Sequence, residues 1–172
     1  MKSLQRPGLA VTLTLWGVVG YCGEKWEITP VLLGEYQQRL DAKNRLTLPA
    51  KLRSYFAEGV VVTKGFDGCL LVFPRGSWNS FVESRLERLD PFSKESRRLS
   101  RWFYAGANEC ELDGQGRIML TQPLMQHGKV DKDVVVAGAR DYLEVWDAET
   151  WSRVQAESEG SVEDVAERLS QP

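Results

Sequence analysis

Two short segments of the sequence place an aspartate four residues before an arginine. Asp41 precedes Arg45 in the first segment, and Asp113 precedes Arg117 in the second. A carboxylate and a guanidinium at this spacing can form a two-point ion pair across a tight turn. Such a pair can brace the turn, or it can hold the arginine so that its remaining donors contact a phosphate or a guanine edge. Both interpretations remain open at this point.

Basic residues surround the first pair. Residues 36–53 contain five basic residues and one acidic residue, a local net charge of +4. A local basic surface is what phosphate binding requires, although ordinary solvated surfaces also have this composition. Around the second pair lie Glu109 and Glu111, so the two copies would not bind an anion equally. The basic residues of the first segment are Arg39, Lys43, Arg45, Lys51 and Arg53.

The bulk composition is that of a soluble globular protein. The chain has 172 residues and a formal net charge of −2, but residues 155–172 alone contribute −4, from five acidic residues against Arg168. One histidine and three widely spaced cysteines are too few for a zinc site or a His-based triad, so we expect no metal, no cofactor and no catalytic residues. The sparse, odd number of cysteines favours a reducing cytoplasm over a disulfide framework.

The first thirty residues contain an apolar stretch that imitates a signal peptide. This stretch, residues 9–22, has 14 residues, which is too short to span a bilayer. It also lacks the small-residue cleavage site that export signals carry. Export, an extension without a function and an unrecognised local role are all open. We expect residues 1–31 to lie outside the fold.

The two aspartate–arginine segments belong to a longer internal repeat. The set Asp41, Arg45, Leu46 and Leu48 matches Asp113, Arg117, Ile118 and Leu120 at an offset of 72 residues. Apolar strands predicted at 60–63 and 70–73 recur at 134–137 and 143–146. Two copies are too few for a solenoid, so we expect them to close on each other around a pseudo-twofold axis.

Within each copy the pattern predicts mainly β-strands. Alternating apolar residues enter and leave each turn, and Asn44 and Gly116 hold the turn position that often requires a positive φ. Short helical segments follow at Pro49 and near Pro123. Helical spacing predicts one helix over residues 77–89 and a second helix that turns Leu99, Trp102 and Phe103 inward. We expect the acidic tail to be either a loose helix or disordered.

The segments "GEYQQRLDAKNRLTLPAKLR", "ANECELDGQGRIML" and "VVVAGARDYLEVWDAETW" resemble the MraZ family of bacterial proteins, which have tandem SpoVT-AbrB-type halves. The resemblance covers residues 33–151 in order. It implies an α+β, mainly β fold: a pseudo-twofold β-barrel of the swapped-hairpin or double-psi type with appended helices. The implied divisions are repeat 1 at 35–77, connecting helices at 78–106, repeat 2 at 107–150 and an acidic tail at 151–172.

The resemblance also implies a function. Related proteins form ring-shaped homo-oligomers, bind short repeated sites in double-stranded DNA, and regulate the division and cell-wall gene cluster that includes their own gene, often as repressors. For this chain it implies a cytoplasmic, nucleoid-associated regulator with no membrane and no small-molecule substrate. Asp41 and Asp113 would orient the arginines. DNA contacts would come mostly from the first hairpin, through Arg45, Lys43, Arg39, Lys51 and Arg53, with Arg117 as a further contact or a brace.

Three features depart from the family pattern. Asn44 stands where glycine is usual, Thr121 replaces a common proline, and residues 1–31 have no counterpart, which is typical of a misplaced start site. A second hypothesis is a barrel of the antitoxin type that captures a protein through its acidic tail. An enzyme is a distant third, because the sequence contains no nucleophile–base pair, metal cluster or phosphate-binding loop.

Overall fold

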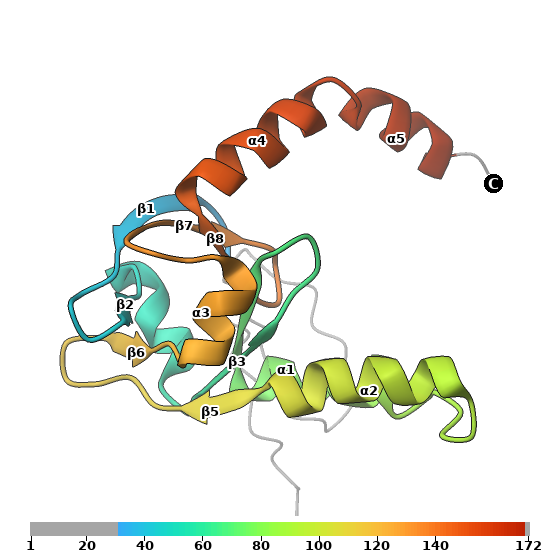
Figure 1. Cartoon of the computed structure of the whole chain (residues 1–172), viewed down its shortest axis with the longest axis horizontal. Helices are drawn as coiled ribbons and strands as arrows, with labels where there is room; N and C mark the ends of the chain where they lie inside the picture. The colour runs from blue at the N-terminus through green and yellow to red at the C-terminus, as the bar shows by residue number, and fades with distance from the viewer. Residues whose placement is uncertain (1–30, 171–172) are drawn as a thin grey trace, which may run out of the picture.

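The computed structural model describes residues 31–170, so the expectation for the N-terminal extension lies outside the described residues. Strands and short helices alternate twice, and longer helices follow each round (Figure 1). The first round contains β1 (Glu35–Arg39), β2 (Arg45–Thr47), η1 (Ala50–Phe56), β3 (Val60–Lys64), β4 (Leu70–Pro74), α1 (Arg75–Phe81), η2 (Val82–Leu86) and α2 (Lys94–Gly106). The second contains β5 (Asn108–Cys110), β6 (Arg117–Met119), α3 (Gln122–Gly128), β7 (Asp133–Gly138), β8 (Leu143–Asp147), α4 (Ala148–Glu159) and α5 (Val162–Ser170).

The strands form two antiparallel sheets that interleave the repeats. The larger sheet has the order β1-β7-β8-β4-β3-β5, and β2 pairs with β6 in a separate two-stranded ribbon. This order reads the same when β1–β4 are exchanged with β5–β8, as a duplication around a pseudo-twofold axis predicts. Four pairings join strands of different repeats: β1 with β7, β2 with β6, β3 with β5 and β4 with β8. Neither repeat therefore completes its sheets alone.

The predicted mixed fold with mainly β structure is confirmed, but no closed sheet is found among residues 31–170. Strands β1 and β5 are the edges of the six-stranded sheet, and the ribbon is hydrogen-bonded separately. An isolated bridge between Leu40 and Leu46 connects the end of β1 to the start of the ribbon.

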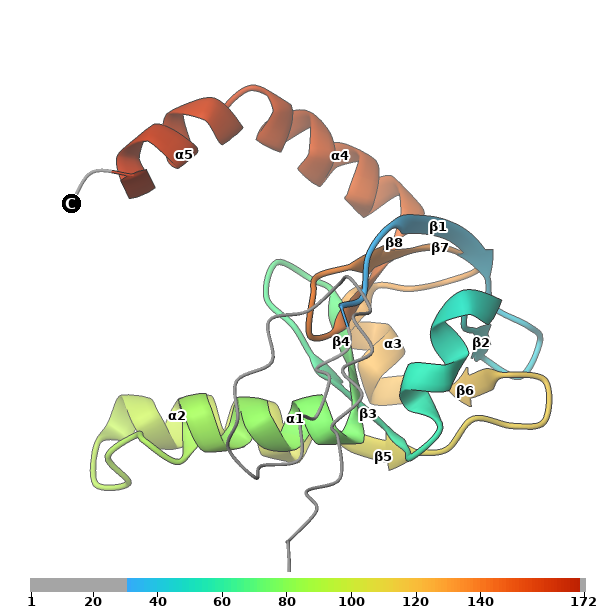
Figure 2. The ribbon, with the colours of Figure 1, turned by 180° about the vertical axis from the view of Figure 1, so that it is seen from behind.

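The central strands β3 and β4 of the larger sheet are buried on both faces. Val60 and Val62 of β3 pack into one core with Leu46 and Ile118 of the ribbon, whereas Val61 points into the opposite core. The second core lies between the sheet and the helices α1, η2, α2 and α4 (Figures 1 and 2). This burial on both sides explains why β4 and the first three residues of β3 are all apolar and do not alternate.

The helices largely follow the predicted spacing. The helix predicted for residues 77–89 is α1 continued by the π-helical turn η2. Helix α2 begins after Ser93, whose Oγ accepts a hydrogen bond from the backbone N of Ser96 at 3.4 Å. The inward direction predicted for Trp102 is wrong: its side chain is 38% exposed, and its ring meets His127 edge-on at 5.2 Å between centroids. Trp102 lies on the flank of α2, and Phe103 takes the buried place.

The acidic tail is helical. Helix α4 begins at Ala148, where Oδ1 of Asp147 accepts a hydrogen bond from the backbone N of Thr150 at 3.0 Å. Trp151 and Val154 of this helix pack against the second core. Helix α5 follows after a short turn and extends away from the body of the molecule (Figures 1 and 2).

Candidate nucleic-acid interface

The loop between β1 and β2 is built by one aspartate. Oδ1 of Asp41 accepts hydrogen bonds from the backbone N of Lys43 at 2.9 Å and of Arg45 at 3.0 Å. Asn44 closes the turn with a φ of 58°, a left-handed value that asparagine tolerates better than most residues. The prediction of a positive φ at this position is confirmed.

The loop between β5 and β6 repeats this construction. Oδ1 of Asp113 accepts from the backbone N of Gln115 at 2.9 Å and of Arg117 at 3.0 Å, and Gly116 has a φ of 75°. The two loops also support each other's strands. The carbonyl of Asn44 accepts from Leu120 N at 3.0 Å, and the carbonyl of Gly116 accepts from Leu48 N at 2.9 Å.

The two aspartate–arginine pairs meet across the ribbon. Nε and Nη2 of Arg45 each lie 2.7 Å from Oδ2 of Asp41, and Arg117 holds Oδ2 of Asp113 with the same two distances. In addition, Nη1 of Arg117 lies 3.6 Å from Oδ2 of Asp41. We call these four residues, Asp41, Arg45, Asp113 and Arg117, the Asp–Arg cluster. Sequence reasoning treated two separate pairs, whereas the fold makes one electrically neutral group.

The cluster keeps its carboxylates ionised. Hydrogen bonds from the Arg45 side chain hold the pKa of Asp41 at about 2, and hydrogen bonds from the Arg117 side chain hold the pKa of Asp113 at about 2. Bonds from the backbone N–H groups of each loop act in the same direction. Both arginines therefore face permanent negative charges at neutral pH and keep a fixed orientation.

The ribbon has one buried face and one outer face. Leu46 of β2 and Ile118 of β6 are cross-strand partners, and both are fully buried. Because successive side chains of a strand point to opposite faces, their neighbours point outward. We call this outer surface the ribbon face. It consists of Arg45, Thr47, Arg117 and Met119.

Thr47 and Met119 are residues of this face that sequence reasoning missed. Met119 is the cross-strand partner of Arg45, and it is 56% exposed. Thr47 is the partner of Arg117 and is partly buried. The period-two alternation of "RLTLP" and "RIML" carried the signal, because it places each of them two residues from an arginine on the same side.

Three of the remaining basic residues lie on exposed surface near the ribbon. Lys43 is exposed in the first loop. The ammonium group of Lys51 on η1 lies 4.8 Å from the ring centroid of Tyr36. Arg39 of β1 is directed toward Asp133 of β7, with 3.4 Å between Nε and Oδ1, so part of its charge is compensated.

Arg53 does not lie freely with the others. Its Nε donates to the carbonyl of Leu48 at 2.9 Å. Its side chain also passes so close to Gly116 that a Cβ at this glycine would lie 2.3 Å from Nε. The structure therefore places Arg53 as a strut between the first repeat and the second hairpin.

Other kinds of site find little support in the described residues. Among residues 31–170 there is no group of three or more His, Cys, Asp or Glu side chains arranged to hold a metal ion. In the same residues, no helix combines the length and the apolar character needed to cross a membrane.

The sequence is similar to one family over almost all of its described length. A family profile described as "MraZ protein, putative antitoxin-like" matches residues 31–102 and matches again at 103–171. A relative from Heliobacterium modesticaldum, named "Transcriptional regulator MraZ", is 44% identical over 140 residues, which is 81% of this chain and 96% of the relative. Relatives of the same name from Desulforamulus reducens and Lachnoclostridium phytofermentans are 41% and 42% identical, over 81% and 82% of this chain and 97% and 96% of their own lengths.

Proposed function

The chain belongs to the MraZ family, and from this premise we propose that it is a sequence-specific DNA-binding regulator of transcription. The relatives from Heliobacterium modesticaldum and Desulforamulus reducens align with this chain over almost their full lengths, and both are named transcriptional regulators. The proposal rests on the ribbon face. Arg45 and Arg117 lie together on this face, and each is held by an ion pair with an aspartate. No catalytic role is assigned to any residue.

The shape of the ribbon suits the major groove of DNA. A two-stranded antiparallel β-ribbon fits this groove, and side chains on its outer face can then reach base edges. The buried partners Leu46 and Ile118 anchor the ribbon to the core, so its outer face is presented on a rigid support. A rigid support reduces the conformational entropy lost on binding.

The arginines retain donors for this contact. A guanidinium has five N–H groups, and Arg45 uses Nε and Nη2 on Asp41. Its Nη1 lies 3.8 Å from Asp113, which is too long for a strong hydrogen bond and leaves it free to turn to another acceptor. We propose that Arg45 contacts a guanine edge or a phosphate, that Arg117 is either a further contact or a brace, and that Asp41 and Asp113 orient them.

Electrostatic attraction to DNA comes from residues outside the neutral cluster. We propose that Lys43, Lys51 and Arg39 supply phosphate contacts, because all three are exposed beside the ribbon. Arg53 uses Nε on the carbonyl of Leu48, so we propose that it contacts phosphate only through its Nη groups. The second loop has Gln115 where the first has Lys43, so the first hairpin would carry most of the attraction.

A surface with so few free cations binds DNA weakly when it acts alone, and its affinity falls steeply with salt. We propose that the protein acts as a ring-shaped homo-oligomer on short direct repeats, where each later contact gains from a high effective concentration. The proposed targets are the division and cell-wall gene cluster and the protein's own gene, with repression as the outcome, in the cytoplasm at the nucleoid. No cofactor and no small-molecule substrate belong to this proposal.

We also propose a closed architecture for the two repeats. The sheet and the ribbon would form a pseudo-twofold barrel with exchanged hairpins, which the shared core and the bridge between Leu40 and Leu46 support. The divisions are 35–77 and 107–150 for the repeats, 78–106 for the connecting helices and 151–172 for the tail.

DNA upstream of the gene provides the test. Fluorescence anisotropy would compare fragments that carry one, two or three of its direct repeats with fragments of equal length in which the repeats are shuffled. We expect affinity to rise more than tenfold from one repeat to three, and shuffled DNA to bind at least a hundredfold more weakly. Equal binding to native and shuffled fragments would exclude sequence-specific regulation.

A further inference from the structure

Helix α5 has an apolar stripe that stays exposed in the described part of the chain, residues 31–170. Val162, Val165, Ala166 and Leu169 recur at the spacing of one helix face. Every residue of α5 is exposed, and Leu169 is 82% exposed. A helix of nine residues has marginal stability in water without tertiary contacts. We therefore expect the stripe to pack against another surface.

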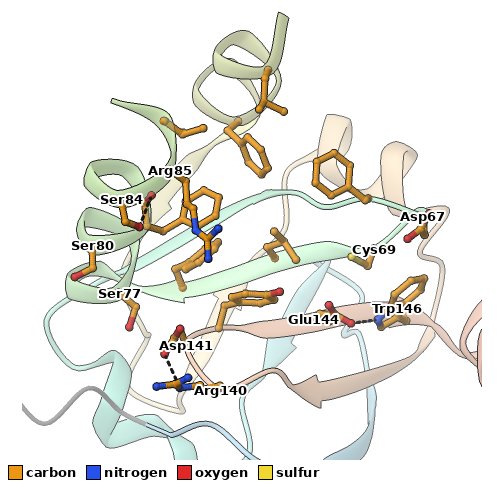
Figure 3. Close-up of a pocket in the computed structure, with 18 residues that line it drawn as sticks. Asp67, Cys69, Ser77, Ser80, Ser84, Arg85, Arg140, Asp141, Glu144 and Trp146 are labelled. Atoms are coloured by element: carbon orange, nitrogen blue, oxygen red, sulfur yellow. Dashed lines mark hydrogen bonds and ion pairs between the residues drawn. The ribbon is translucent and has the colours of Figure 1, made fainter. Parts of the chain in front are cut away.

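A groove of suitable character lies between the larger sheet and the helices α1, η2 and α2. This helix–sheet groove has a volume of about 710 Å³. Its floor and walls are mainly apolar and include Leu71, Phe73, Phe81, Leu99 and Phe103 (Figure 3). The buried Oγ of Ser77 on its wall has no hydrogen-bond partner among the described residues.

The rim of the groove carries charges of both signs. Glu144 accepts a hydrogen bond from Nε1 of Trp146 at 2.9 Å, and Asp141 lies 3.7 Å from Nε of Arg140 (Figure 3). Arg85 enters from η2, and Asp67 lies at the end toward the β3–β4 turn (Figure 3). Within residues 31–170, Glu144 and Asp141 thus have partners and Asp67 has none. Arg85 forms no ion pair with these residues, so its guanidinium can meet an incoming carboxylate.

The larger charge pattern matches the two elements. Residues 75–106, which form the helical wall of the groove, hold seven basic and four acidic residues, a net charge of +3. Residues 148–170, which form α4 and α5, hold six acidic and two basic residues, a net charge of −4. Opposite net charges favour the encounter of these two surfaces. They also favour an orientation in which the acidic side of α5 faces the basic helices.

The same molecule does not bring α5 to its own groove. Figures 1 and 2, drawn from opposite sides, both show α5 along the top of the molecule and α1 and α2 along the bottom. Helix α4 holds α5 there, because its start is capped by Asp147 and its residues Trp151 and Val154 pack on the second core. The occupant is therefore sought in a second copy.

We propose that α5 of one copy docks in the helix–sheet groove of the next copy. The stripe of Val162, Val165 and Leu169 enters the groove, and Glu163 and Glu167 face Arg85 and the arginines of α2. The two surfaces are different parts of the chain, so the contact is head-to-tail, and repetition closes a ring when the rotation permits. This inference rests on the oligomer of the proposed function and names the contact that builds it.

One substitution tests the stripe against a matched control. Val165→Asp places a charge in the stripe, whereas Ser161→Asp adds the same charge before α5, where aspartate is a good helix cap. We expect light scattering to give the mass of a single chain for Val165→Asp and the wild-type mass for Ser161→Asp. A wild-type mass for Val165→Asp would overturn the docking and leave the ring intact. A monomeric wild-type protein would instead overturn the ring and the docking, without touching DNA recognition.

Covalent trapping identifies the partner surface. Cys22, Cys69 and Cys110 are first replaced by alanine, in a background whose mass by light scattering equals that of the wild type. Leu169→Cys and Ser84→Cys are then placed in differently tagged chains that are co-expressed and mildly oxidised. A disulfide between the two tagged chains is the expected product. The absence of this product would overturn docking in a second copy. A single chain that carries both cysteines is also oxidised, and a disulfide formed only within that chain would overturn it as well.

Discussion

Nη1 of Arg45 lies 3.8 Å from Oδ2 of Asp113, so an arginine of the first repeat approaches the aspartate of the second. The ribbon pairing produces this approach, because Arg45 and Arg117 lie diagonally across β2 and β6. The two repeats therefore present one surface to a ligand. A change in either pair is expected to affect the orientation of both arginines.

The Asp–Arg cluster makes stability depend on pH in an acidic window. The pKa of Asp41 and of Asp113 is about 2 in the fold, against 3.8 for an unperturbed aspartate. Because these pKa values are lowered by folding, the stabilisation is complete above about pH 4 and is lost as the pH falls toward 2. Urea denaturation at pH 5 and at pH 2 measures this loss. The free energy of unfolding should fall less between these two pH values for Asp41→Asn than for the wild type. Identical pH slopes would contradict the hydrogen-bonded cluster.

Substitution by alanine is expected to destabilise the protein more at Gly116 than at Asn44. Both have a positive φ, and alanine in this conformation costs about 1–2 kcal/mol. A Cβ at Gly116 would also displace the side chain of Arg53. Gly116→Ala should therefore lower the free energy of unfolding more than Asn44→Ala does. Repeating Gly116→Ala in an Arg53→Ala background supplies the control, since the additional cost should disappear there. A cost unchanged by Arg53→Ala would mean that Arg53 does not brace the second hairpin.

The two faces of the ribbon should respond differently to truncation. Leu46 is fully buried, and Leu46→Ala is expected to cost about 2–5 kcal/mol of unfolding free energy through the cavity it leaves. Met119→Ala, on the exposed ribbon face, should cost less than about 0.5 kcal/mol. Chemical denaturation of both variants checks this difference, and equal costs would show that the ribbon is not anchored as described.

The unequal charge of the two loops gives a gain-of-function prediction. Gln115 occupies the place in the second loop that Lys43 occupies in the first. Gln115→Lys adds a cation beside the ribbon, and it should tighten DNA binding and steepen the plot of log affinity against log salt by about 0.9 for each new phosphate contact. Gln115→Glu is the matched variant and should weaken binding. If both substitutions leave the salt slope unchanged, the second loop does not lie near DNA.

Much of the fold could be predicted from local patterns. The repeat, the short strands, the positive φ at Asn44 and the helices after each repeat all follow from alternation, helical spacing and turn chemistry. These signals are contained within a few neighbouring residues. The pairing of β1 with β7 is different, because nothing in either strand specifies which of the apolar strands becomes its neighbour.

The candidate site was predictable in its residues but not in its arrangement. The sequence indicated Asp41 with Arg45, yet the joining of the two pairs depends on the ribbon, which is a contact between distant segments. Charge alone groups Arg53 with the DNA-contacting residues, because it does not show which cations a fold uses internally. Its hydrogen bond to Leu48 appears only when η1 is placed against the hairpin.

The most direct test of the central claim is the affinity of Arg45→Ala for the DNA upstream of the gene. The variant is measured beside Lys43→Ala, whose side chain lies outside the cluster, and both are first shown to keep the wild-type oligomeric mass and thermal midpoint. We predict that Arg45→Ala binds at least tenfold more weakly and discriminates less between native and shuffled repeats. Lys43→Ala should weaken binding to both DNAs alike and reduce the salt slope by about 1. An Arg45→Ala protein that remains oligomeric and binds its upstream DNA with unchanged affinity would contradict recognition by the ribbon face.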